Sequence, residues 1–441
     1  MFRDTASRLW DRGTWVRRNI VLRVSGLPFD RLILWIGRWV SGLPIRWIAL
    51  LLGWLVIIAC LAAMARGFLR GPLADFAAVH AAGLASLQGL NPYDEPLLLQ
   101  LNPAALFPFI YPPYVLPVAR WIAHIPYFAA GTMMGVIVLL AVTYMYLAQA
   151  RLFGLVATST GALVLFIGTA AGSAVWAAST GNVSVLLYAL LTFGLVRLEN
   201  KRPLAMVLVV AAAALVKPYY LGFLLLPLLI DWRRCWPWAV LAVVAVALAY
   251  AGSYVSDPVM FQHFRGSLAQ RYAQGDYGDG PFGFFLTAID RLSVYGKIHL
   301  PHAVGYAAFA GFLGVAFVLF LRLAAAYRKE ASPEQRTYLL GLLWIGMILC
   351  LPRLKVYDGF AAFVPAFALL ARRVWDRPLV MKPKWFLLPF LMLPVGFSFF
   401  AHIAELISLH WLTVMLGLCW LLAYWAYERG VRETNTAAVR L

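Results

Sequence analysis

Apolar runs of near-spanning length recur along the whole chain, and they restrict its fold more than any other feature. Examples are Trp47 to Met64, Tyr127 to Ala148, Ala239 to Tyr250, Tyr306 to Leu321 and Trp411 to Tyr427. A backbone inside a bilayer must satisfy its own hydrogen bonds, and runs of this length do so as helices. With 63% hydrophobic and 13% charged residues, the 441-residue chain lies outside the range of soluble domains. The sequence predicts an all-α polytopic membrane protein with about twelve transmembrane helices.

The net charge of +18 is distributed as in a membrane protein, and no nucleic-acid partner is expected. If the N-terminus is cytoplasmic and the first span begins at residue 46, then 27 of the 37 Lys and Arg residues fall on the cytoplasmic side. This asymmetry is the one that the positive-inside rule describes. We therefore predict a multi-pass protein of the bacterial inner (cytoplasmic) membrane, surrounded by membrane lipids, with both termini in the cytoplasm.

The same orientation predicts the domain organisation. Residues 1–45 lack the apolar core and cleavage site of a signal peptide, and RLILWIGRWV is typical of an amphipathic helix lying at the membrane interface. Residues 46–427 form a single transmembrane domain, and 428–441 form a cytoplasmic tail. Three segments face outward, toward the periplasm or exterior: 67–113, 256–302 and the basic turn 351–359. The four cysteines show no paired spacing, so neither a disulfide framework nor a metal site is indicated.

Asp75 stands at the head of the first outward segment, where it opens the run DFAAVHAAGLASLQG. One interpretation is structural, because an acid at this position can be the N-cap or a first-turn residue of a helix. The other is catalytic, because a carboxylate partly desolvated at the membrane surface becomes more basic and could accept a proton from a substrate hydroxyl. Spacing alone leaves both interpretations open.

The order of motifs in this region resembles glycosyltransferase family 87, whose members transfer a sugar from a polyprenyl-phosphate donor and have the GT-C fold. The resemblance rests on Asp75-Phe76, Ala81-Ala82, Gly89, NPYD (91–94), YPP (111–113), TGNVSVLLYALL (180–191) and AAAALVKPYYLGFLLLPLL (211–229), which follow one another between about residues 70 and 370. It implies an inverting mannosyltransferase-like hexosyltransferase with Asp75 as general base and a lipid- or glycan-linked acceptor. The chain departs from the family at Val79 and His80, where aromatics are usual, and in the turn LPRLKVYDGF.

Three cations on the outward side are candidates for binding the donor phosphate, namely Lys217, Arg353 and Lys355. A lysine inside an apolar stretch is costly to bury and is therefore a functional-site signal. The stretch Pro203 to Asp231 lies between two basic cytoplasmic turns, which predicts a helical hairpin broken at Lys217-Pro218. The alternatives are that Lys217 extends to the interface and that the other two belong to a solvated turn.

Further residues of the outward side are candidates for substrate binding. They are His80, Asn91, Tyr93, Asp94, Tyr111, Asn182, Tyr219, His263, Tyr357 and Asp358. The proline-dense stretch from Gly89 to Pro117 breaks helices repeatedly, so we expect a loop with short helical pieces that forms the membrane-surface wall of the active site. Tyr93, Tyr111 and Tyr114 would supply ring faces and hydroxyls there.

No cofactor or metal is expected. The DYGD sequence at 276–279 could suggest metal ligands, but its glycines favour an ordinary turn. No glycine-rich nucleotide motif accompanies a strand and a helix, which favours a lipid-linked donor over a nucleotide sugar.

Two other functions remain open from the sequence. A secondary transporter would be expected to show a two-fold repeat and mid-membrane acids, and the chain shows neither. A lipid-linked glycan transporter or flippase would share the lipid substrate and the basic cavity. The long first outward segment with Asp75 at its head is expected of a transferase and not of a flippase.

Overall fold

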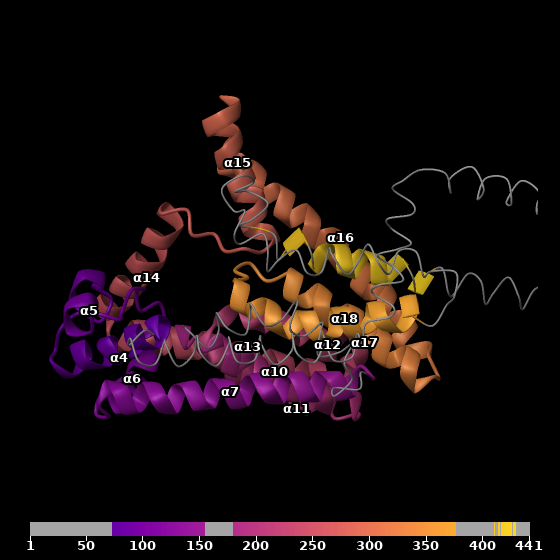
Figure 1. Ribbon diagram of the computed structural model, residues 1–441, viewed down its shortest axis with the longest axis horizontal. Coiled ribbons are helices and arrows are strands. Elements are labelled where there is room, and N and C mark those ends of the chain that lie inside the picture. The colour runs from indigo at the N-terminus through magenta and orange to yellow at the C-terminus, as the bar shows by residue number, and fades with distance from the viewer. Residues whose placement is uncertain are drawn as a thin grey trace, which may run out of the picture. The chain divides into compact units, whose positions relative to one another are not determined.

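The computed structural model describes residues 73–154, 180–375 and parts of 410–428. The chain divides into two compact units, Met1–Leu55 and Val56–Leu441, and every described residue belongs to the second. Within the described residues all regular secondary structure is helical (Figure 1). The predicted interfacial segment 1–45, the span Trp47 to Met64 and all of the predicted tail 428–441 except Glu428 lie outside the described residues.

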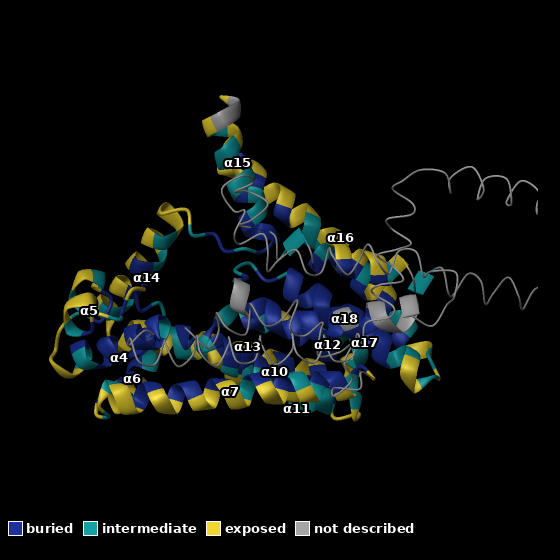
Figure 2. Cartoon of the chain, in the orientation of Figure 1, coloured by how far each residue is buried: buried dark blue, intermediate teal, exposed yellow. Residues whose placement is uncertain are grey.

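Three of the described helices are long and apolar enough to cross a membrane. They are α7 (Tyr127–Leu152), α13 (Trp232–Ser256) and α16 (His302–Lys329). Each contains one of the predicted apolar runs, so these three predictions of helices are confirmed. The faces of these helices that point away from the rest of the protein expose large apolar side chains such as Leu140, Leu248 and Val315 (Figure 2). Contact of such side chains with water is unfavourable, whereas contact with lipid is not. The predicted total of about twelve spans stays a prediction.

Shorter helices pack between and beside the long ones. These are α10 (Ser184–Glu199), α11 (Pro203–Val216), α12 (Leu225–Ile230), α17 (Pro333–Leu349) and α18 (Phe360–Trp375), and a further apolar helix covers Leu416–Trp425 within the predicted last span. Helix α10 contacts α7 and α11, and α17 contacts α16 and α18. All residues of α17 from Thr337 to Leu349 are buried, as expected for a helix that is apolar on every side.

The predicted break at Lys217-Pro218 is confirmed. Helix α11 ends at Val216, and the 3-10 helix η3 (Pro218–Leu224) begins directly after Lys217. Lys217 itself is extended, with φ −137° and ψ 100°, because a residue that precedes proline is disfavoured in the helical region. The returning segment, η3 and α12, contacts α11, so the chain reverses at this lysine.

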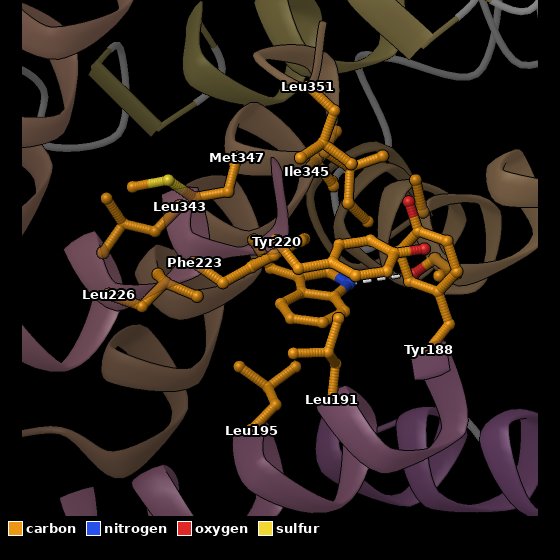
Figure 3. Close-up of a cluster of buried hydrophobic side chains, with 14 of the residues drawn as sticks. Tyr188, Leu191, Leu195, Tyr220, Phe223, Leu226, Leu343, Ile345, Met347 and Leu351 are labelled. Carbon is orange, nitrogen blue, oxygen red and sulfur yellow. Dashed lines mark hydrogen bonds between the residues drawn. The ribbon is translucent and has the colours of Figure 1, made fainter. Parts of the chain in front are cut away.

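A buried aromatic cluster fixes the segment that follows the break (Figure 3). Tyr220 of η3 packs against Tyr188 of α10, and Phe223 of η3 packs against Trp344 of α17, with ring centroids 5.4 and 5.1 Å apart. The indole N–H of Trp344 donates a hydrogen bond of 2.9 Å to the Ala361 carbonyl. Such clusters restrict side-chain motion, so the position of the neighbouring Lys217 is determined by the core rather than by a surface loop.

The predicted outward segments fold as short helices and connecting loops. The first, 67–113, contains α4 (Ala74–Leu87) and α5 (Glu95–Leu101), and it ends where the 3-10 turn η1 (Pro113–Val115) leads into α6 (Leu116–Ala123). Helix α4 packs so closely on α6 that a Cβ at Gly83 would lie 2.1 Å from the Ala119 carbonyl oxygen. The expected mixture of loop and short helical pieces between Gly89 and Pro117 is confirmed.

The second outward segment forms α14 (Pro258–Ala273) and α15 (Pro281–Gly296), and the basic turn leads into the 3-10 helix η4 (Val356–Gly359). An ion pair of 3.1 Å between Arg271 and Glu95 joins α14 to α5. The predicted outward segments are thus packed against one another, as a site built from all of them requires.

Candidate active site

A cavity of about 260 Å³ brings together charged and polar residues from five separate segments. Asp75 comes from α4, Asn182 from the turn before α10, and Lys217 from the break after α11. Asp276 lies in the loop between α14 and α15, and the pair Arg353 and Lys355 lies in the turn before η4. Below, this cavity is called the polar cavity.

Asp75 lies in the first turn of α4 but does not cap it. The N-cap position is Leu73, and no side chain accepts a hydrogen bond there, so the N-cap interpretation of Asp75 is wrong, whereas its placement as a first-turn acid is confirmed. Its Oδ2 instead accepts a hydrogen bond of 2.9 Å from the amide of Asn182. Burial raises the pKa of the Asp75 carboxyl above its ordinary value, and the Asn182 hydrogen bond and the Lys217 charge oppose this shift. A carboxylate with a raised pKa is a stronger base than an exposed one.

Asn182 connects Asp75 with Lys217. Its Oδ1 accepts the backbone N–H of Ser184 at 2.8 Å and the Lys217 ammonium at 3.4 Å, which leaves its Nδ2 to donate to Asp75. The two donors on Oδ1 therefore determine which way the amide faces. Gly181, at φ +63°, makes the turn that directs this side chain, and the loss of its conformational freedom would disturb the turn.

Lys217 is buried, with 8% of its surface exposed, so it does not extend to the interface. Its ammonium donates to the Ser184 hydroxyl as well as to Asn182, and lies 5.9 Å from the centre of the Tyr111 ring. The cation is thus held by two hydrogen bonds and an aromatic face, which compensate in part for its burial.

Arg353 and Lys355 share one carboxylate. Arg353 Nη2 lies 2.6 Å from Oδ2 of Asp276, and Lys355 Nζ lies 2.5 Å from Oδ1. Partial burial raises the pKa of Asp276, but the two cations outweigh that effect and hold it below the ordinary value. Asp276 is therefore an anion under ordinary conditions.

Asp358 is a second buried acid at the start of η4. Its Oδ2 accepts the backbone N–H of Lys355 at 2.7 Å, while Oδ1 is buried with no hydrogen-bond partner among the described residues. Burial raises the pKa of this carboxyl to about 6, although the Lys217 charge acts in the opposite direction.

A second cavity of about 390 Å³ adjoins the polar one and has largely apolar walls. Tyr219, Tyr250, Phe264, Leu268 and Tyr272 line it, and it is called the apolar cavity below. The two cavities share Tyr111 and the three predicted phosphate-binding residues Lys217, Arg353 and Lys355. The cations thus lie where a polar space meets a space suited to a hydrocarbon chain.

Of the predicted substrate-binding residues, Tyr111, Asn182, Tyr219 and Asp358 line one or both cavities. The structure places five others outside them, namely His80, Asn91, Tyr93, Asp94 and His263. The side chain of Tyr357 lies outside the described residues.

Four of the five side chains outside the cavities have local partners. The His80 ring lies 3.0 Å from the Ile125 carbonyl, and Asp94 caps α5 through the backbone N–H of Leu97. Asn91 accepts the backbone N–H of Tyr93, whose hydroxyl donates to the Tyr111 carbonyl at 2.8 Å. Tyr93 therefore stabilises the cavity residue Tyr111 from outside the cavities.

Several cavity residues were not among the predicted site residues. Thr180, Arg271, Asp276 and Asp279 line the polar cavity, and Tyr250, Phe264, Leu268 and Tyr272 line the apolar one. Thr180 could have been found from its place two residues before Asn182 in the TGN motif. Tyr250, Phe264 and Tyr272 carry no such signal, because aromatic residues at helical spacing are equally typical of ordinary packing.

Comparison with known families identifies the family of this chain. The family model described as glycosyltransferase family 87 matches residues 109–352, which is more than half of the chain. The chain belongs to glycosyltransferase family 87. Membership indicates a membrane-embedded glycosyltransferase, consistent with the apolar helices. No curated protein matches the chain.

The match to glycosyltransferase family 87 covers Asn182, Lys217 and Asp276 but begins after Asp75 and ends just before Arg353. The structure nevertheless brings all five into one cavity. The placement of Asp75 and Arg353 in the site therefore rests on the structure rather than on the family match.

Proposed function

We propose that this family 87 protein is an inverting hexosyltransferase of the GT-C fold that uses a polyprenyl-phosphate sugar. The proposed sugar is mannose, and the proposed acceptor is lipid- or glycan-linked. One observation carries the proposal: Lys217, Arg353 and Lys355 line both the polar cavity that contains Asp75 and the adjoining apolar cavity. A lipid-linked sugar phosphate has the same order of parts, with an anion between a polar sugar and a hydrocarbon chain.

The donor phosphate would lie at the three cations, with the isoprenoid chain in the apolar cavity and the sugar in the polar one. Charge-assisted hydrogen bonds from Lys and Arg stabilise phosphate oxygens, and they strengthen as charge develops on the leaving group. The aromatic walls formed by Tyr250, Phe264 and Tyr272 offer contacts for the first isoprene units.

Asp75 would act as the general base. The acceptor oxygen forms a bond to the anomeric carbon while the bond from that carbon to the phosphate oxygen breaks. The acceptor proton passes to the Asp75 carboxylate, and the bonding electron pair leaves with the lipid phosphate. The raised pKa of Asp75 favours this transfer, which typically contributes about 10²- to 10⁴-fold to the rate.

The proposal is tested by incubating the purified protein with a panel of polyprenyl-phosphate sugars and a membrane extract as the source of acceptor. We expect release of free lipid phosphate from one sugar in the panel, and no transfer when a nucleotide sugar replaces the lipid donor. Movement of intact donor across vesicles without cleavage of the sugar–phosphate bond would instead support the flippase alternative.

We also propose that the site faces the periplasm or exterior of the bacterial inner membrane, with both termini in the cytoplasm. Gln88 and Gln274 are exposed in the predicted outward segments, and Glu334 is exposed at the start of α17. Single cysteines at Gln88 and Gln274 should react with an impermeant thiol reagent on intact spheroplasts, and one at Glu334 should not. The reverse pattern would invert the proposed orientation.

A further inference from the structure

Two of the three proposed phosphate-binding cations, Arg353 and Lys355, already have a carboxylate partner that the proposed transfer reaction does not use. Asp276 accepts from Arg353 with one oxygen and from Lys355 with the other, at 2.6 and 2.5 Å. Its side chain is only 24% exposed, and it lines the same polar cavity as the general base. A phosphate bound at these cations would therefore share them with Asp276.

The backbone around Asp276 holds it in this position. The N–H of Asp279 donates to the Leu354 carbonyl at 2.5 Å, and the hydroxyl of Thr413 donates to the Asp279 carbonyl. Gly278, at φ +87°, lies against the basic turn so closely that a Cβ there would come 3.0 Å from the Leu354 carbonyl oxygen. The loop and the basic turn are thus docked, and the carboxylate stays near the cations.

A fixed carboxylate beside a phosphate site affects ligands according to their charge. The donor is a phosphodiester with one negative charge, whereas the lipid product is a phosphomonoester with close to two, since the second pKa of such a phosphate is about 6. The polar cavity is lined by four cationic and three acidic residues, so its excess of positive charge is small. The additional charge of the product is repelled by Asp276 at short range and in a medium of reduced dielectric.

We propose that Asp276 is a specificity-determining residue that favours singly charged lipid phosphodiesters over doubly charged lipid phosphomonoesters, and so promotes release of the lipid phosphate product. The inference rests on the proposed function, because it assumes that Arg353 and Lys355 bind the donor phosphate. In this role Asp276 discriminates between ligands by their charge and takes no part in bond formation or cleavage.

Binding of two probe lipids measures this discrimination without turnover. The probes are a short-chain polyprenyl phosphate and its monomethyl ester at pH 8, which differ in charge and carry no sugar. For Asp276→Asn, we expect the affinity for the monoester to rise about 10²- to 10³-fold more than the affinity for the methyl ester, because one elementary charge about 4–6 Å from Asp276 is relieved of repulsion at an effective dielectric constant of about 20. Asp276→Glu should retain the wild-type ratio.

Asp290→Asn is the matched control, since Asp290 is another acid of the second outward segment but pairs with His302 at 2.6 Å and lines neither cavity. Its affinity ratio should equal that of the wild type. If Asp276→Asn does not fold in detergent, Asp276→Ser serves as the second neutral variant.

If Asp276→Asn gained equal affinity for both probe lipids, or gained no affinity for either, the inference would be overturned. If the wild type transfers sugar and yet the ratio of monoester to methyl ester affinity is unchanged in the neutral variant, the inference fails and the proposed function stands. If the wild type binds neither probe and transfers no sugar from any lipid donor, the proposed function fails and the inference fails with it.

Discussion

Replacement of Asp75 by Asn tests the proposed mechanism most directly. The amide has nearly the same shape as the carboxylate and keeps an oxygen that can accept the 2.9 Å hydrogen bond from Asn182. Because Asp75 does not cap α4, the substitution removes no capping interaction. We therefore expect the variant to fold as the wild type does, with a melting temperature in detergent close to that of the wild type.

The expected loss is in transfer. An amide cannot accept the acceptor's proton, so the rate should fall by about 10²- to 10⁴-fold, the contribution of a positioned general base. That loss corresponds to about 2.7–5.4 kcal/mol in activation free energy, at 1.36 kcal/mol for each factor of ten. The assay is the initial rate of lipid phosphate release at saturating donor, with donor affinity measured separately.

The pH dependence provides a second measurement on the same residue. Only the deprotonated form of Asp75 can act as base, and its pKa is raised by burial. Activity of the wild type should therefore decline on acidification, beginning at a pH above the one at which an ordinary aspartate protonates. The residual activity of the Asn variant should lose this acidic limb.

Asp94→Asn is the matched control for Asp75→Asn. Asp94 caps α5 and lines neither cavity, and Asn serves nearly as well as Asp at an N-cap. It should therefore retain wild-type transfer. Near-normal transfer by Asp75→Asn would refute the assignment and direct attention to Asp358 or Asp276 as the base.

Three further predictions concern the groups around Asp75. Arg353→Gln together with Lys355→Gln should raise the donor KM about tenfold or more while the protein stays folded, because two phosphate-binding charges are lost; unchanged donor kinetics would remove the pair from the site. Asn182→Ala should lower kcat about tenfold and displace the acidic limb of the pH profile toward higher pH, because Asp75 loses the hydrogen bond that lowers its pKa. A pH profile identical to that of the wild type would argue that Asn182 does not position Asp75. Asp358→Asn should stabilise the protein by about 1–3 kcal/mol at pH 8 and not at pH 3.5, as measured by thermal unfolding. The reason is that a carboxyl whose folded-state pKa is about 6 destabilises the folded state only at a pH above its unfolded-state pKa of 3.8. Equal stability of the variant and the wild type at pH 8 would contradict this prediction.

The sequence by itself determined the features that depend on local chemistry. Apolar runs predicted helices such as α7, α13 and α16, because a helix satisfies its own backbone hydrogen bonds wherever it lies in the bilayer. The break at Lys217-Pro218 followed from the covalent structure of proline. The motif order likewise indicated the family that the match over residues 109–352 shows.

The tertiary structure decided which of the candidate polar residues meet. Asp75 and Asn182 are 107 positions apart and share a hydrogen bond, while His80, five residues after Asp75, is turned toward the Ile125 carbonyl. The partnership of Asp276 with Arg353 likewise depends on the docking of two loops 77 positions apart. Spacing along a helix reports which face a side chain occupies, but not what packs against that face, because the contacts between distant segments are set by the shape and volume of the whole core.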